Sequence, residues 1–263
     1  MNYRKILLVL LIGISAFFQE TVIAKSLYPR KKLDLDIVFI GNSITQGSKL
    51  DHPEQDAAPV VAARYLRKKT EFGSVSFLNQ GRSGFTSFDF LPSTPAFSKV
   101  VDATKQLHSN PAHLLIFSIK LGTNDSAIEG PNGAPVSKDA YRQNMKAIVD
   151  ALLIRFPGSI IVLQQPIWYS PNTQNNSKYL EEGLARLQTY FPELRQLVKN
   201  YAKTSKNQVF MGDQNGYEYF RKNYLTDLVA EKGKQGIFYL HPNIKGATKL
   251  GELWGVSIYK VIK

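Results

Sequence analysis

The sequence of 263 residues contains no cysteine. This absence excludes disulfides, thiolate metal sites, a cysteine nucleophile and a lipoprotein anchor attached through cysteine. The folded chain must therefore be stabilised by its core alone. A hydrophobic content of 43% is ordinary for a globular protein, and the length is sufficient for one large α/β domain.

The sequence also lacks a long apolar run. Residues 6–18 are apolar but too few to span a bilayer, which takes roughly 20 residues. Two basic residues precede this run, and polar residues followed by the small residue Ala24 come after it, as in a signal peptide. We therefore expect residues 1–24 to be a signal peptide and residues 25–263 to form one domain. The protein would be exported, to a periplasm or outside the cell, without stable membrane insertion after cleavage; an uncleaved anchor is the alternative.

Acidic residues are few, with 21 Asp and Glu against 33 Lys and Arg, so the formal net charge is +12. Cleavage after Ala24 would remove Arg4, Lys5 and Glu20 and leave +11. Such a charge can attract acidic polysaccharide, anionic lipid or nucleic acid through long-range steering. The basic residues are scattered in small groups, however, and no nucleic-acid motif accompanies them. We interpret them as a solvated basic surface and expect no nucleic-acid partner.

Short, continuous apolar runs indicate strands of a parallel sheet that is covered on both faces. These runs are residues 36–40, 75–78, 114–119, 160–163 and 209–211. Helical patterns lie between and after them, at residues 57–69, 98–107, 139–156, 179–203 and 244–261, and Pro192 is expected to interrupt the fourth. This alternation predicts an α/β fold, a doubly wound parallel sheet with right-handed crossovers.

Ser43 follows the first predicted strand in the sequence Gly41-Asn42-Ser43. Ligands of open parallel sheets bind outside the carboxyl ends of the strands, so this position suits a nucleophile. From position alone, a turn residue or a helix N-cap is the favoured explanation of the serine. A serine nucleophile also needs a base to accept its proton and donors for the developing oxyanion.

Candidate donors follow the next two strands. The second strand leads into Gly81, where the missing side chain lets the backbone approach a ligand, and the third leads into Gly122-Thr123-Asn124-Asp125. In a parallel sheet these strand ends can converge on one crevice. Taken singly, each also fits an ordinary glycine turn.

The base is expected to be histidine, whose pKa near ~6.5 suits proton transfer at neutral pH. Of the four histidines, His52 lies in a polar loop, His108 ends a helix and His113 opens a strand at the far edge. His241 precedes Pro242 at the start of the closing helix, which would hold its ring at a loop-to-helix junction. A capping or packing role for His241 is the alternative.

Four blocks in order resemble the GDSL/SGNH hydrolases: Gly41-Asn42-Ser43-Ile44-Thr45, Gly81, Gly122-Thr123-Asn124-Asp125 and His241-Pro242-Asn243-x-x-Gly246. The resemblance implies a flavodoxin-like three-layer α/β/α sandwich with a five-stranded parallel sheet. It further implies ester hydrolysis through an acyl-enzyme, with Ser43 as nucleophile and His241 as base. The N–H groups of Ser43 and Gly81 and the side-chain amide of Asn124 would form the oxyanion hole, and Asp125 would brace its loop. Asn42 replaces the aspartate commonest before the serine in this family.

A larger departure from the family lies three residues before the histidine, where Phe238 occupies the usual place of an aspartate that orients the imidazole. A backbone carbonyl could orient the ring instead, giving a Ser-His dyad, which we favour. Among the carboxylates that could substitute we favour Asp213, just past the fifth strand. Asp227 and Glu231, in a stretch expected to be helical, are the others.

The resemblance covers lysophospholipases, thioesterases, lipases and glycan acetylesterases. The loops expected near the crevice are polar with interspersed aromatics, among which Trp168 and Tyr169 would either stack on a sugar or be buried in the loop. We expect a small-molecule or glycan ester substrate, with an acetylated carbohydrate favoured. A lysophospholipase or broad short-chain esterase is one alternative, and an inactive carbohydrate-binding module is another. No motif indicates a metal or cofactor.

Overall fold

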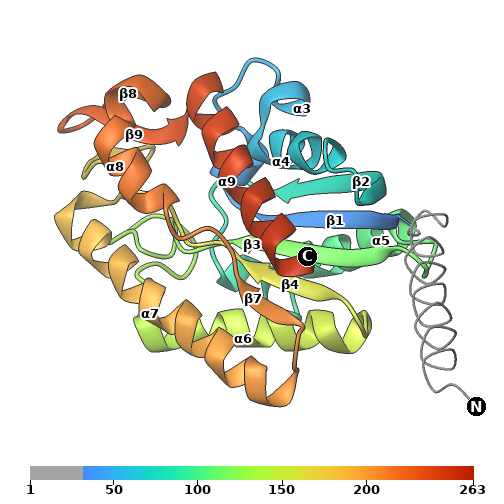
Figure 1. Cartoon of the computed structure of the whole chain (residues 1–263). Coiled ribbons are helices and arrows are strands. Elements are labelled where there is room, and N and C mark those ends of the chain that lie inside the picture. The colour runs from blue at the N-terminus through green and yellow to red at the C-terminus, as the bar shows by residue number, and fades with distance from the viewer. Residues whose placement is uncertain (1–31) are drawn as a thin grey trace, which may run out of the picture. The chain divides into compact units, whose positions relative to one another are not determined.

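A computed structural model describes residues 32–263; the predicted signal peptide, residues 1–24, lies outside the described residues. Residues 33–263 form one compact unit built on a five-stranded parallel sheet with helices on both faces (Figure 1). The strands are β1 (Leu33–Gly41), β2 (Phe72–Gly81), β3 (Leu114–Lys120), β4 (Ile160–Leu163) and β7 (Val209–Met211). Their order, β2-β1-β3-β4-β7, is that of a flavodoxin-like sheet. The predicted fold class is thus confirmed.

The helices divide between the two faces of this sheet (Figure 1). One face carries α4 (Ala58–Arg67) and the closing helix α9 (Ile244–Ile262), and the other carries α5 (Pro95–Leu107), α6 (Lys138–Arg155) and α7 (Leu180–Thr204). The chain moves from β1 to β2 in one direction and then through β3, β4 and β7 in the other. Because parallel crossovers are right-handed, the connecting helices change face where the direction reverses.

That reversal creates a switch point at the carboxyl ends of β1 and β3, which are neighbours in the sheet. Gly41, the last residue of β1, lies opposite Lys120, the last residue of β3. The segments that follow carry Ser43 and Asn124. The topology alone therefore brings two of the predicted site residues to one edge of the sheet.

The core agrees with the apolar runs in the sequence. Residues 35 to 40 of β1 are buried without alternation, as expected for a strand covered on both faces. The closing helix α9 approaches α4 closely because it presents glycines there. A Cβ at Gly251 would lie 2.5 Å from the Val61 side chain, and one at Gly255 would lie 2.7 Å from the Tyr65 ring.

The prediction that Pro192 interrupts its helix is wrong, since α7 runs unbroken through this residue. A proline in a helix interior costs about 3 kcal/mol or more. Buried side chains on both sides of it, including Leu187, Tyr190 and Leu194, pack into the core and hold the two halves in line.

A two-stranded antiparallel hairpin, absent from the predicted elements, precedes α9. It follows α8 (Gly216–Asp227) and consists of β8 (Leu228–Gly233) and β9 (Gly236–Pro242), joined by a two-residue loop. Asp227 and Glu231 were both expected in a helical stretch; Asp227 is the last residue of α8, whereas Glu231 lies on strand β8. The remaining short elements are α2 (Ser43–Gln46), α3 (Pro53–Asp56), η1 (Phe88–Phe90), β5 (Thr173–Gln174) and β6 (Ser177–Lys178).

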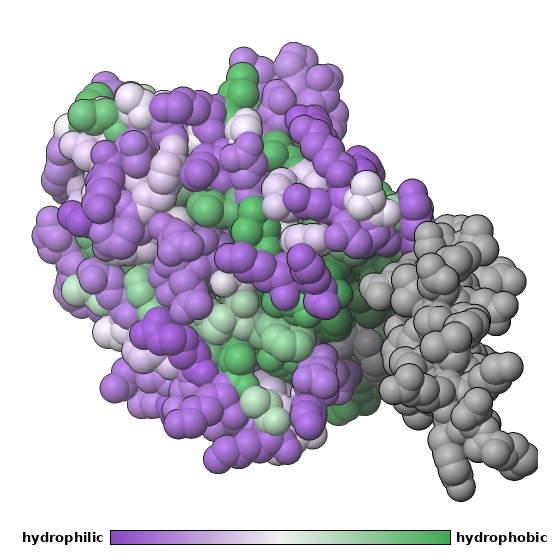
Figure 2. Space-filling model, in the orientation of Figure 1, coloured by the Kyte–Doolittle hydropathy of each residue, from purple (hydrophilic) through white to green (hydrophobic). Residues whose placement is uncertain are grey.

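The face of the molecule in Figure 2 is largely hydrophilic, and apolar side chains show mainly in the hollow below α9. A groove there is lined by residues of β7 and α9, among them Phe210, Met211 and Leu253. Within residues 32–263 no helix is both long enough and apolar enough to cross a membrane.

Lys120 ends β3 inside the protein, with 1% of its surface exposed. Its amine donates a hydrogen bond to the Thr123 hydroxyl, 3.2 Å away. Burial lowers the pKa of Lys120 from 10.5 to about 7. The folded protein therefore holds this proton more weakly than the unfolded chain does.

We expect Lys120→Met to raise thermal stability most below pH 7, where folding must bury the charged amine. The difference between a pKa of 10.5 and one of about 7 corresponds to a gain on the order of 5 kcal/mol, at about 1.4 kcal/mol for each tenfold change in proton affinity. The gain should shrink as the pH rises from 7 toward 10.5, because the folded state is by then already neutral. Melting temperatures of both proteins from pH 6 to pH 9.5 test this. Lys222→Met, an exposed lysine of α8, is the matched control. A gain that does not change with pH would contradict the explanation.

Candidate active site

Ser43 stands at a sharp turn from strand to helix. β1 ends at Gly41, and Asn42 caps the one-turn helix α2 by accepting a hydrogen bond from the Ile44 N–H at 3.2 Å. Gly47, at a φ of 82° that favours glycine, ends α2. An aspartate at position 42 would accept the same bond through its own side-chain oxygen, so asparagine preserves the turn that presents Ser43.

His241 lies beside this serine although 198 residues separate them in the sequence. Its Nε2 is 2.9 Å from Ser43 Oγ, as the sequence led us to expect. His241 is near the end of β9, and Asn243 caps α9 directly after it by accepting from the Gly246 N–H at 3.0 Å. The motif His241-Pro242-Asn243-x-x-Gly246 thus fixes a strand-to-helix turn that aims the imidazole at Ser43.

The other ring nitrogen of His241 meets a carboxylate from the neighbouring strand. Nδ1 is 2.6 Å from Glu231 Oε1, and Glu231 is 5% exposed. The favoured sequence hypothesis of a Ser-His dyad oriented by a backbone carbonyl is therefore wrong. A third side chain, Glu231, completes the arrangement, although Asp213 was the carboxylate favoured from the sequence.

A β-bulge brings His241 to the side of Glu231. In the β8–β9 ladder Glu231 is directly opposite Phe238, so both side chains point to one face. Regular alternation would send His241, three residues after Phe238, to the opposite face. Between the Ala230–Tyr239 and Leu228–Pro242 pairs, β9 contains one residue more than β8. This extra residue reverses the alternation and turns the imidazole toward the carboxylate.

Asp213, the carboxylate favoured from the sequence, has a different role. Its Oδ1 accepts from the Asn215 N–H and its Oδ2 from the Gly216 N–H, each at 2.9 Å. Both oxygens thus satisfy backbone donors at the start of α8. The proposal that Asp213 orients His241 is contradicted, because Glu231 already occupies the bond to Nδ1.

The surroundings of Glu231 keep it ionised. Its Oε2 accepts from Gln174 Nε2 at 3.0 Å and lies 3.1 Å from Lys49 Nζ. Burial alone would raise the pKa of Glu231, but the bond to His241 and the contacts with Gln174 and Lys49 outweigh it and lower the pKa to about 2. An ionised carboxylate only accepts, so Nδ1 carries the imidazole hydrogen and Nε2 is free to accept from the serine hydroxyl.

Asn124 reaches the same edge of the sheet from the loop after β3. Its Nδ2 donates to the Phe85 carbonyl at 2.8 Å, and its Oδ1 accepts from the Tyr179 hydroxyl at 2.8 Å. These bonds fix which end of the amide is the donor and use one of its two hydrogens. Asp125 accepts from the Ser87 and Gly122 N–H groups, so it braces the loop as expected.

The sequence of residues 39–249 matches the GDSL-like Lipase/Acylhydrolase family. The chain belongs to this family. It is therefore a carboxylic ester hydrolase. The family that the four sequence blocks suggested is confirmed. A comparison with curated protein sequences finds no match.

Solved structures of esterases share the fold of this family member. A carbohydrate acetylesterase from Sinorhizobium meliloti superposes with a TM-score of 0.57 at 16% identity, over 86% of this chain and 99% of that one. An acetylxylan esterase from Geobacillus stearothermophilus gives 0.58 at 16% identity, over 86% and 93%. An aryl esterase from M. smegmatis gives 0.54 at 15%, over 86% and 99%. At these identities the likeness shows the fold alone.

Gly81 does not serve as the free backbone donor that the sequence suggested for this hydrolase. Its N–H donates to Asn79 Oδ1 at 3.0 Å, and a Cβ at Gly81 would lie 2.3 Å from the Gln46 nitrogen. Gly81 is glycine because α2 packs directly on its backbone. Three residues later Gly84, at a φ of 79°, has open space around the position of a Cβ, and its N–H has no acceptor among residues 32–263.

Trp168 and Tyr169 are not exposed platforms for a sugar. Trp168 is 9% exposed and packs on Tyr224, while Tyr169 is fully buried and shares a hydrogen bond with Ser126. Burial in the loop, the second of the two sequence hypotheses, is the observed one.

The other histidines lie apart from Ser43. His108 and His113 both bind the buried Asp36 through Nδ1, at 2.9 and 3.2 Å, and His52 is near Glu54 on the surface. Within the described part of the chain no group of three His, Asp or Glu side chains is arranged to hold a metal ion.

We expect Glu231→Gln to lower kcat by roughly 10²–10⁴, because an amide can hold the imidazole in the wrong tautomer and cannot stabilise imidazolium. Hydrolysis of a chromogenic acetate ester, measured with the melting temperature of each variant, tests this. Asp213→Asn is the matched control and should retain most of the activity. Strong loss in Asp213→Asn with a nearly silent Glu231→Gln would reverse the assignment.

Proposed function

We propose that this family member is a serine esterase that removes acetyl groups from a carbohydrate through an acyl-enzyme. The observation that carries the proposal is the continuous hydrogen-bonded row from Ser43 Oγ through His241 to Glu231. A serine becomes nucleophilic when a base accepts its proton and a third group orients that base. These three residues meet that requirement.

The reaction has two halves. Ser43 Oγ attacks the ester carbonyl carbon while His241 Nε2 takes the hydroxyl proton, and the imidazolium then gives that proton to the departing sugar oxygen. The acetyl group is left on Ser43. Water, deprotonated by the same nitrogen, attacks the acyl-enzyme and releases acetate, and the proton returns to Ser43. Glu231 stays ionised throughout and acts as a positioning residue through the imidazole.

Three donors are candidates for the oxyanion. The Ser43 N–H lies in the first turn of α2 and has no intrahelical acceptor. The second hydrogen of Asn124 Nδ2 is not used in the bond to Phe85. The third candidate is the N–H of Gly84, not that of Gly81. In the sequence Gly84 lies between Ser83 and Phe85. The Ser83 N–H donates to the Gln46 side chain of α2, and the Phe85 carbonyl accepts from Asn124. We therefore expect the Gly84 N–H to lie between α2 and Asn124.

The small acyl group is supported by the limited access to the serine. Ser43 is 5% exposed and His241 is 9% exposed, so the nucleophile offers little room for a long chain. The carbohydrate is supported by the two structural neighbours described as a carbohydrate acetylesterase and an acetylxylan esterase. A polysaccharide outside the cell also fits the predicted signal peptide.

Acetate release from a panel of acetylated oligosaccharides, beside p-nitrophenyl esters of increasing acyl length, tests the proposal. We expect acetate esters to be hydrolysed best and sugar acetates to release acetate. Ser43→Ala should abolish release and leave the fold intact, because Asn42 and not the Ser43 hydroxyl caps α2. Preference for long acyl chains would favour a lysophospholipase. No hydrolysis of any ester by the parent protein would favour a carbohydrate-binding module.

We expect Asn124→Ala to lower kcat by roughly 10²–10³ with little change in KM, the usual loss for one oxyanion donor. Tyr179→Phe is the matched variant, since it removes one bond that holds Asn124 but leaves its amide in place. Its effect on kcat should be smaller. An Asn124→Ala protein altered in KM alone would assign the amide to ground-state binding.

A further inference from the structure

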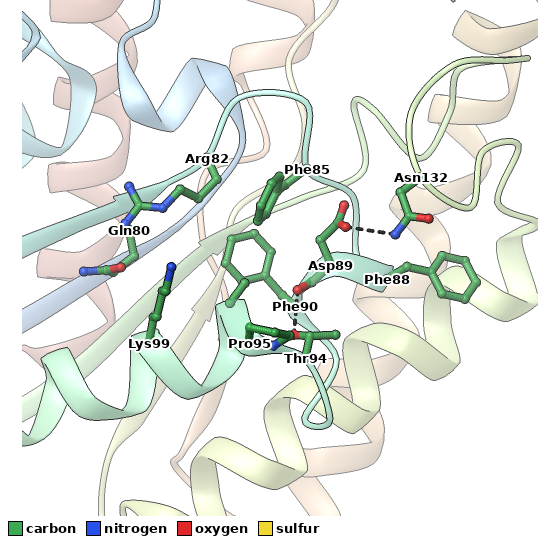
Figure 3. Close-up of a pocket in the computed structure, with 11 residues that line it drawn as sticks. Gln80, Arg82, Phe85, Phe88, Asp89, Phe90, Thr94, Pro95, Lys99 and Asn132 are labelled. Carbon is green, nitrogen blue, oxygen red and sulfur yellow. Dashed lines mark hydrogen bonds between the residues drawn. The ribbon is translucent and has the colours of Figure 1, made fainter.

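A cavity of about 300 Å³ opens beside the loop that follows β2. Figure 3 shows that the rings of Phe85 and Phe90 lie between two polar walls. Gln80, Arg82 and Lys99 form one wall, and Asp89 and Asn132 lie on the other side. We call this space the aromatic cavity.

Two lining residues connect the aromatic cavity to the candidate active site. The ring of Phe85 lines the cavity, while its carbonyl accepts the hydrogen bond from Asn124. Arg82, also in the lining, follows Gly81 directly, and its N–H donates to the Gly41 carbonyl at 2.9 Å, two residues before Ser43. The residues that line the cavity are thus bonded to the segments that carry Ser43 and Asn124, and we expect an extended substrate whose ester is at Ser43 to reach it.

The positive charges of the cavity are not neutralised by the protein. Arg82 and Lys99 form no ion pair with any carboxylate of residues 32–263, and Arg82 makes only a 3.4 Å bond to the Gly81 carbonyl. Ion pairs do form elsewhere, as between Arg142 and Glu193 and between Arg186 and Glu182. Two unpaired cations that project into one cavity attract an anion there.

The one carboxylate in the cavity is already bound. Asp89 Oδ2 accepts from the N–H and the hydroxyl of Thr86, at 2.8 and 3.2 Å, and Oδ1 accepts from Asn132 Nδ2 at 2.9 Å. Figure 3 places it across the aromatic rings from Arg82 and Lys99. Two cations and one carboxylate leave a net charge of +1, which matches a monoanionic carboxylate better than a dianionic phosphate.

We propose that the aromatic cavity is a subsite for a carboxylate-bearing sugar, a uronic acid residue next to the acetylated one. Arg82 and Lys99 bind its carboxylate, and the Phe85 ring packs on the apolar face of its pyranose ring. This proposal rests on the proposed function, since it specifies the glycan on which the esterase acts. The proposal also assigns two of the chain's many basic residues, Arg82 and Lys99, a role in substrate binding.

Binding can be tested without catalysis, with Ser43→Ala protein and two unesterified probes. Tetra-galacturonic acid should bind more tightly than neutral xylotetraose by isothermal titration calorimetry. Arg82→Gln and Lys99→Gln should each weaken binding of the acidic probe by roughly 5- to 20-fold and leave the neutral probe unaffected. Lys105→Gln is the matched control, because it removes the same charge from the same helix, α5, at a position that does not line the cavity and is paired with Asp102.

Equal affinity for both probes would overturn the subsite, and so would a loss in Lys105→Gln as large as that in Lys99→Gln, because only the net charge would then matter. Acetate release separates the two proposals. Binding of tetra-galacturonic acid that depends on Arg82 and Lys99, without release of acetate from acetylated galacturonans, would uphold the subsite and overturn the esterase assignment. Release from acetylated xylan at the same kcat/KM as from acetylated galacturonan would overturn the subsite alone.

Discussion

The hydrogen bond between Glu231 and His241 is the contact on which the candidate active site depends. It fixes the tautomer of the imidazole, and the tautomer decides whether Nε2 can accept a proton from Ser43. The bond in turn requires the bulge in β9, because a regular ladder would turn the ring away from the carboxylate. A single extra residue in a short hairpin thus sets the chemistry available to a serine that is almost 200 residues away in the sequence.

The sheet and its helices could be predicted from the sequence because buried strands and helix faces require apolar residues at regular positions, and these positions can be read from the sequence. Each of the five strands of the sheet contains one of the short apolar runs found from the sequence, and the alternation of these runs with helical patterns indicates a parallel sheet. Ser43, Asn124 and His241 could be located by the same reasoning, since each follows a predicted strand or precedes the closing helix. The prediction of a helix break at Pro192 was wrong because the sequence shows only the cost of a proline inside a helix. The tertiary packing of α7 that offsets this cost is not visible in the sequence.

Glu231 could not be assigned because its role depends on strand pairing. The available signal was the spacing of Gly233 and Gly236, which close the two-residue loop of the hairpin, but the register and the bulge depend on tertiary contacts. Gly81 failed as a donor for a similar reason. The side chain of Asn79 accepts a hydrogen bond from the Gly81 N–H, and the sequence does not reveal that bond.

The carboxylate that contacts His241 belongs to Glu231 on β8 and not to residue 238 on β9, and this placement affects the packing of the site. Phe238 is free to be aromatic, and its ring packs 5.5 Å from that of Tyr179, whose hydroxyl holds Asn124. The hairpin that carries Glu231 and His241 and the loop that carries Asn124 are thereby joined across one buried aromatic contact. Thermal opening of either segment must break this contact, so the two halves of the site lose their order together and form one cooperative unit.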